Sequence, residues 1–127
     1  MIVAGIGCGR GALSADIVSL ILAVLASFGV PSEKLDAIAT ETAKAEEGGI
    51  ANAAEYLSVR LVKCSIADLE GVADKVVTRS ARVQALKGVP SIAEASALVA
   101  AGHNARLLGA RAAADKVTCA IAIGEGP

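Results

Sequence analysis

The chain has few aromatic and few metal-binding side chains. Its 127 residues include one Phe, one Tyr, one His and no Trp. Single-stranded nucleic acids are bound largely on stacked aromatic side chains, and a net charge of −1 provides no basic field to attract a polyanion. We therefore expect no nucleic-acid partner. We also expect no metal site, because a single His offers too few ligands for one.

Cysteine is scarce as well. Cys8, Cys64 and Cys119 form an odd set, and no two of them have the Cys-x-x-Cys spacing. Neither a disulfide framework nor a zinc knuckle fits this pattern, which is typical of a reducing compartment. We therefore expect a cytoplasmic protein. We also expect no cofactor.

Long apolar runs are missing, apart from one segment that imitates the core of a signal peptide. This segment, residues 17–28, reads IVSLILAVLASF. Asp16 stands at its entrance and a glycine-rich stretch precedes it, which argues against a signal peptide. The segment is also too short to span a bilayer, so no membrane association is expected.

The composition suits one domain over residues 1–127, with 54% hydrophobic and 20% charged residues and a core of Ala, Val, Leu and Ile. Strand-like and helical patterns alternate along it. The expected strands are residues 1–6, 36–40, 59–64, 105–108 and 117–123, and the main expected helices are 14–28, 50–57, 80–87 and 91–101. This alternation predicts an α/β fold, a three-layer α/β/α sandwich with a mixed, mostly parallel sheet. The last two strands have a short link and are expected to pair antiparallel.

Two helix starts carry specific predictions. Ser14 is expected to be the N-cap of the helix at 14–28. Ser91 and Glu94 have the spacing of a capping box, in which each side chain bonds the backbone N–H of the other residue. The helix at 14–28 is apolar on more than one side. We expect the sheet to cover one side, and either a neighbouring helix or the second subunit of a homodimer to cover another.

The most unusual stretch is GIGCGRGA at residues 5–12, between the first strand and the first helix. Such an arrangement can present backbone N–H groups and a helix N-terminus to an anion. It completes neither a dinucleotide fingerprint nor a P-loop, since a later glycine and the Lys-Ser/Thr pair are missing. The alternatives are a tight turn and a nucleotide- or phosphate-binding loop. Arg10 and the helix N-terminus would both lower the pKa of Cys8 and favour a thiolate, whereas a buried packing role would not.

Four segments in order resemble the CobE family, which is shared with the C-terminal half of CbiG. They are Gly5-Ile-Gly-Cys-Gly-Arg-Gly11, Ala43-Lys-Ala-Glu-Glu-Gly48, Gly88-Val-Pro-Ser-Ile-Ala-Glu-Ala-Ser-Ala-Leu98 and Val117-Thr-Cys-Ala-Ile-Ala122. The chain departs from the family pattern at Gly9, where a basic residue is usual. It also departs at Ala110, where a proline is usual, although Arg111 keeps the following charge.

The resemblance implies a role in cobalamin biosynthesis. It suggests a protein that binds a precorrin or hydrogenobyrinate-type intermediate, with other enzymes of the pathway as further partners. Such a tetrapyrrole or corrinoid carries many carboxylates around a flat apolar body. We expect Arg10, Lys44 and Arg111 to surround one mouth at the carboxyl ends of the strands. The full set of expected ligand-binding residues is Gly7, Cys8, Gly9, Arg10, Gly11, Lys44, Ser91 and Arg111.

The alternative is a hydrolase that opens a precorrin lactone and releases acetaldehyde, as the resemblance to CbiG implies. Its candidate catalytic residues are Glu46 or Glu47 as a general base and Cys8 as a nucleophile. Both glutamates equally fit ordinary charges in the first turn of a helix. The sequence has no evident Ser/His/Asp or Cys/His set, which favours binding over catalysis.

Overall fold

A computed structural model describes the backbone of residues 1–127 and all side chains except those of Arg82 and Lys87. The chain forms six strands, six α-helices and two short 3-10 helices. In order these are β1 (Ile2–Cys8), α1 (Ser14–Ser27), η1 (Ser32–Lys34), β2 (Ala37–Glu41), α2 (Thr42–Ala45), α3 (Gly48–Leu57), β3 (Arg60–Cys64), α4 (Ile66–Gly71), η2 (Ala73–Lys75), α5 (Ala81–Lys87), α6 (Ile92–Ala101), β4 (Arg106–Leu107), β5 (Ala112–Ala114) and β6 (Val117–Ile123).

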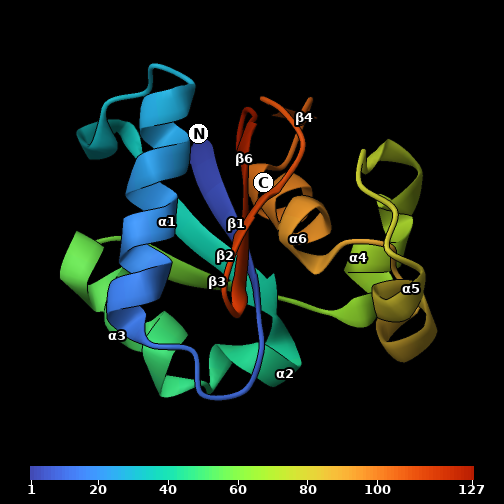
Figure 1. Cartoon of the computed structure of the whole chain (residues 1–127). Coiled ribbons are helices and arrows are strands. Elements are labelled where there is room, and N and C mark those ends of the chain that lie inside the picture. Colours follow the sequence, from blue (N-terminus) through green and yellow to red (C-terminus); the bar gives the residue numbers. More distant parts are fainter.

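The strands form one mixed sheet in the order β3-β2-β1-β6-β4, with β5 also paired to β6. β1, β2 and β3 are parallel neighbours, whereas β6 runs antiparallel to β1, β4 and β5. The sheet separates α1 and α3 on one face from α4, α5 and α6 on the other (Figure 1). The predicted three-layer α/β/α sandwich with a mixed sheet is confirmed, and so is the antiparallel pairing of the last strands.

Alternate residues of β1 serve two separate apolar cores. Ala4 and Ile6 are fully buried with the residues of α1 and α3, and Val3 is buried with the residues of α6. α1 is covered by the sheet and by α3, so the neighbouring helix expected from its apolar pattern is α3. Leu22, which lies off the main apolar face of α1, stays 38% exposed.

The start of α1 differs from the expectation. The N-cap is Leu13, which makes no side-chain hydrogen bond, and Ser14 is already the first helical residue. The capping prediction for Ser14 was therefore wrong by one position. The Ser91 hydroxyl does accept from the Glu94 N–H, at 3.3 Å, but the Glu94 carboxylate bonds other segments, so half of the predicted capping box is present.

The first half of the glycine-rich stretch, residues 5–8, is strand. β1 continues through Cys8, and the turn begins at Gly9, whose N–H donates to the Lys116 carbonyl at 2.8 Å. Gly5 faces the backbone of α6, where a Cβ would overlap the Ala93 carbonyl oxygen and lie 2.8 Å from the Ala97 Cβ. Gly5 is therefore a packing requirement, because any side chain there would push α6 off the sheet.

We predict that Gly5→Ala lowers the free energy of unfolding by about 2 kcal/mol or more, because the added methyl group overpacks a rigid backbone contact. Gly9→Ala is the matched control. A Cβ at Gly9 would lie 3.7 Å from the nearest atom, so this change should stay within about 1 kcal/mol of the parent. Urea unfolding of both variants measures the difference. Equal losses in the free energy of unfolding for the two variants would show that the packing of α6 does not require glycine at position 5.

A candidate ligand pocket at the strand ends

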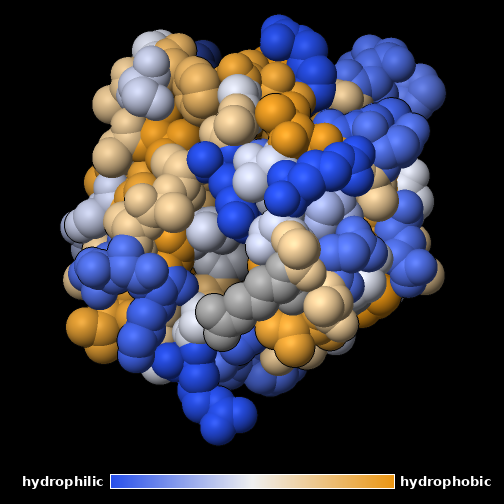
Figure 2. All heavy atoms as spheres, turned by 45° about the vertical axis from the view of Figure 1, so that its right-hand side comes forward, coloured by the Kyte–Doolittle hydropathy of each residue, from blue (hydrophilic) through white to orange (hydrophobic). Residues whose placement is uncertain are grey.

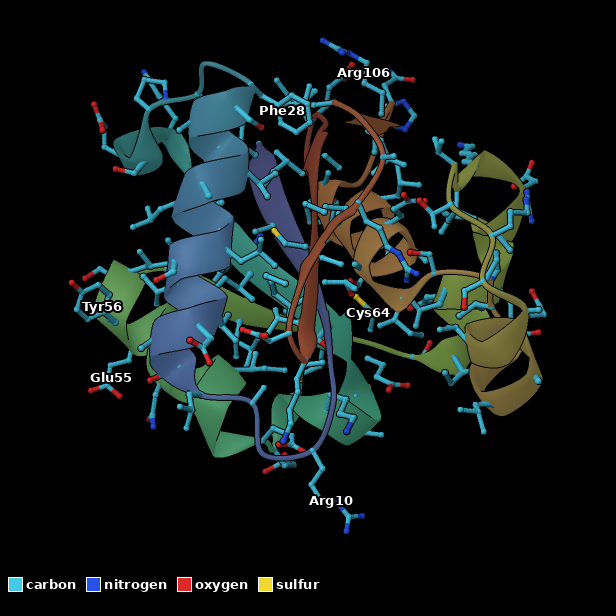
Figure 3. The ribbon with its side chains drawn as sticks, in the orientation of Figure 1. Arg10, Phe28, Glu55, Tyr56, Cys64 and Arg106 are labelled. Atoms are coloured by element: carbon cyan, nitrogen blue, oxygen red, sulfur yellow. The ribbon has the colours of Figure 1, made fainter. Side chains whose placement is uncertain are left out.

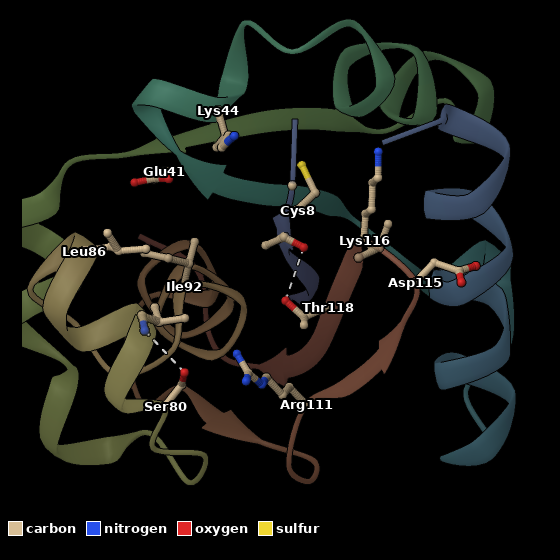
Figure 4. Close-up of a pocket in the computed structure, with 14 residues that line it drawn as sticks. Cys8, Glu41, Lys44, Ser80, Leu86, Ile92, Arg111, Asp115, Lys116 and Thr118 are labelled. Atoms are coloured by element: carbon tan, nitrogen blue, oxygen red, sulfur yellow. Dashed lines mark hydrogen bonds between the residues drawn. The ribbon is translucent and has the colours of Figure 1, made fainter. Parts of the chain in front are cut away.

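A pocket of about 490 Å³ opens at the carboxyl ends of β1 and β2 and the start of β6. It lies at the end of the sheet where ligands of open α/β folds usually bind. Its walls come from distant parts of the chain, and Figure 4 shows many of their side chains. The lining residues are Gly7, Cys8, Gly9, Glu41, Lys44, Ser80, Val83, Leu86, Ile92, Arg111, Asp115, Lys116, Val117 and Thr118.

Basic side chains reach the pocket from three directions. Lys44 comes from α2, Arg111 from the segment before β5, and Lys116 from the turn before β6 (Figure 4). Lys44 is paired with Glu47, with 3.4 Å between Nζ and Oε1. Within the described part of the chain, Arg111 and Lys116 have no ion-pair partner. Two cations are therefore available to an anionic ligand.

The remaining walls differ in polarity. Val83, Leu86 and Ile92 form an apolar side, and Leu86 is 70% exposed. Glu41 and Asp115 add acidic groups, of which Glu41 is buried at the end of β2. Hydrophilic and hydrophobic residues likewise adjoin one another over the face shown in Figure 2. Such a mixture suits an organic ligand with both apolar surface and charge.

Five of the predicted ligand-binding residues line this pocket: Gly7, Cys8, Gly9, Lys44 and Arg111. Arg10 does not line it and extends away from the fold (Figure 3). The expected mouth of three basic residues is therefore corrected to Lys44 and Arg111, joined by Lys116. The physical reason is that β1 ends at Cys8 and the chain turns at Arg10 and Gly11, where Gly11 has a φ of 80° and the Ala12 N–H donates to the Gly9 carbonyl at 3.4 Å.

Two further predicted residues lie elsewhere. Gly11 borders a second hollow of about 520 Å³, which adjoins the first pocket because Asp115, Lys116 and Val117 line both. Ser91 is fully buried and does not line the first pocket, because its hydroxyl caps α6.

The candidate catalytic groups do not assemble. Glu46 and Glu47 are outside the pocket: the Glu46 side chain is 83% exposed and pairs with Lys63, and Glu47 pairs with Lys44. Burial raises the pKa of the Cys8 thiol above its ordinary value; Lys44 opposes this, and Glu47 and Glu41 add to it. Of the two interpretations of Cys8, the buried packing role therefore agrees with the structure. A lowering of its pKa by Arg10 and the helix N-terminus does not, since Arg10 extends outwards and desolvation is the largest effect.

Sequence reasoning missed Glu41, Ser80, Lys116 and Thr118. Glu41 had a usable signal, because it directly follows a predicted parallel strand, whose carboxyl end meets its neighbours at one edge of the sheet. Lys116 and Thr118 face the pocket through the pairing of β6 with β1, in which Thr118 Oγ1 donates to the Gly7 carbonyl at 3.2 Å. Nothing in the local sequence indicates that register.

Two negative findings concern the described part of the chain. No three His, Cys, Asp or Glu side chains there gather as metal ligands. No helix in that part has the length and apolar character needed to cross a membrane.

The fold and the pocket define a small α/β protein with a partly cationic, partly apolar site at its strand ends. The family model described as "Cobalamin synthesis G C-terminus" matches residues 2–122. The chain therefore belongs to this family, and the resemblance noted in its sequence is confirmed. It is a cobalamin biosynthesis protein of the CobE/CbiG C-terminal type.

Individual relatives agree with this assignment. The chain is 33% identical over 121 residues to Protein CobE of Sinorhizobium sp, covering 95% of this chain and 79% of the relative. A crystal structure of CobE from the cobalamin pathway superposes with a TM-score of 0.92 at 30% identity, covering 100% of this chain and 92% of the other. The crystal structure of the cobalamin biosynthesis protein chiG from Agrobacterium tumefaciens superposes with a TM-score of 0.78 at 37% identity. The match covers 98% of this chain and 99% of the other.

The raised pKa of Cys8 makes a prediction about its reactivity. Iodoacetamide should modify Cys8 with a pH midpoint above that of free cysteine, because the thiolate is the reactive form and burial disfavours it. Lys44→Met should move the midpoint higher still, since Lys44 favours the thiolate. Cys64 and Cys119, whose pKa values burial raises to about 11 and about 12, should react at higher pH than Cys8.

Mass spectrometry of each cysteine peptide over a pH series measures these midpoints. A Cys8 midpoint below that of free cysteine would contradict the prediction and support a nucleophilic thiol.

Proposed function

We propose that the chain binds a polycarboxylate tetrapyrrole or corrin intermediate of cobalamin biosynthesis in the pocket at the strand ends. The observation that carries the proposal is the pair of basic side chains, Arg111 and Lys116, that have no ion-pair partner among the described residues and border one pocket with an apolar wall. Acetate and propionate groups are the anions that such cations would meet on a precorrin or hydrogenobyrinate-type ligand.

The two kinds of wall match the two parts of such a ligand. Arg111 offers a planar guanidinium suited to a carboxylate, and Lys116 offers a point charge nearby. Val83, Leu86 and Ile92 provide the surface for a flat apolar ring. A corrin with its acidic side chains is larger than a pocket of about 490 Å³, so we propose that one edge of the macrocycle enters.

Lactone hydrolysis has less support. A thiolate nucleophile conflicts with the raised pKa of Cys8, and Glu46 and Glu47 lie outside the pocket. Glu41 and Asp115 are the carboxylates that the pocket does contain. An assay for acetaldehyde in the presence of lactone-bearing precorrin separates the two functions: a binder changes the absorbance of the pigment without releasing aldehyde.

The binding proposal predicts that Arg111→Ala weakens the affinity for hydrogenobyrinic acid about tenfold, because a hydrogen bond between charged groups is lost. Titration followed by the absorbance of the pigment measures the affinity, and the protein has no Trp to serve as an internal probe. Lys63→Ala is the control: Lys63 is an exposed lysine that pairs with Glu46 and does not line the pocket.

The affinity should also fall as salt is added, since charge attraction at an open site is screened. Equal affinities for the parent, Arg111→Ala and Lys63→Ala proteins would contradict the proposed site. Protection of the protein by inorganic phosphate rather than by the pigment would favour a phosphate-binding function instead.

A further inference from the structure

Glu94 is a fully buried carboxylate in the first turn of α6, and both of its oxygens are hydrogen-bonded. Oε1 accepts from the Val77 and Thr78 N–H groups, each at 2.8 Å. Oε2 accepts from Thr78 Oγ1 at 2.7 Å and from the Arg111 N–H at 2.8 Å. Burying a carboxylate costs free energy unless hydrogen bonds compensate for the lost hydration. The four donors around Glu94 provide that compensation.

The four donors come from two irregular segments that border the pocket. Thr78 lies two residues before Ser80, which lines the pocket, and Arg111 lines the pocket itself. Arg111 follows a bend between two very short strands, β4 and β5. Those strands alone give its backbone little support. The bond from the Arg111 N–H to Glu94 therefore ties the base of this side chain to the rigid, buried helix α6.

We propose that Glu94 is a positioning residue, which holds Arg111 in the pocket through its backbone N–H and thereby sets the affinity for carboxylate ligands. This inference rests on the proposed function of the pocket. Glu94 does not line the pocket, so it acts through Arg111.

The substitution Glu94→Gln distinguishes the contact with residues 77–78 from the contact with Arg111. The amide oxygen of Gln is best placed at Oε1, where two backbone N–H groups need an acceptor. The amide nitrogen then replaces Oε2. Thr78 can rotate its hydroxyl to accept from this nitrogen, whereas the Arg111 N–H meets a second donor and loses its bond. The variant thus keeps the contact with residues 77–78 and releases Arg111.

Thr78→Val is the matched control, because it removes one hydrogen bond to Oε2 and leaves the Arg111 bond in place. We expect Glu94→Gln to weaken hydrogenobyrinic acid binding about fivefold to tenfold, and Thr78→Val to change it less than about twofold. In the Arg111→Ala background, Glu94→Gln should add less than about a twofold loss, because the side chain that it positions is already gone.

Comparison of the single and double variants shows whether Glu94 acts on binding through the Arg111 side chain or only stabilises the fold. An equal loss from Glu94→Gln with and without the Arg111 side chain would overturn the proposal, and so would an unchanged affinity in the single variant. Thermal unfolding is recorded alongside, since both Glu94→Gln and Thr78→Val are expected to lower the midpoint. A shared loss of stability therefore cannot explain a selective loss of affinity.

Hydrogen exchange followed by NMR tests the contact without any pigment. In the parent protein the Arg111 amide should exchange at least about tenfold more slowly than the amides of exposed turns. Fast exchange of this amide would overturn the proposal even if Glu94→Gln fails to fold. If the parent binds no hydrogenobyrinic acid, the proposed function fails, and slow exchange at Arg111 would still show that Glu94 holds this segment.

Discussion

The close contact between α6 and β1 is the constraint on which the pocket depends. Gly5 has no side chain, and Ala93 and Ala97 of α6 lie directly against it. At this separation Ile92 reaches the pocket and Glu94 lies between the segments that carry Ser80 and Arg111. A bulkier residue at position 5 would move the helix and, with it, the wall that the helix supports.

The pocket combines charge and apolar surface because different elements supply them. The basic residues come from short or irregular segments, namely α2, the residue before β5 and the turn before β6. The apolar residues come from α5 and the start of α6. Backbone hydrogen bonds tie two of these segments to the fold. The Gly9 N–H donates to the Lys116 carbonyl, and the Arg111 N–H donates to the Glu94 carboxylate.

Local sequence patterns predicted the layers of the fold, but they did not predict the structure of the glycine-rich stretch or the partners of the Glu94 carboxylate. Alternation of apolar strands with amphipathic helices was enough to predict the sandwich. The glycine-rich stretch was predicted to leave the strand after residue 6, as an anion-binding loop or a tight turn, whereas the strand continues through Cys8. The missing side chains of Gly5 and Gly7 make room for α6 and for Thr118. Glu94 was assigned to a capping box, but its carboxylate bonds residues 16 and 17 positions away, which no local pattern indicates.

The sequence by itself determined the fold class, the family and part of the pocket lining, because periodicity and short motifs are local properties. Lys44 and Arg111 belong to this predicted part. The tertiary structure alone decided that Arg10 extends outwards, that Lys116 enters the pocket, and that desolvation governs the pKa of Cys8. These outcomes follow from the register of β6 on β1 and from the depth of burial, which arise when residues more than a hundred positions apart come together.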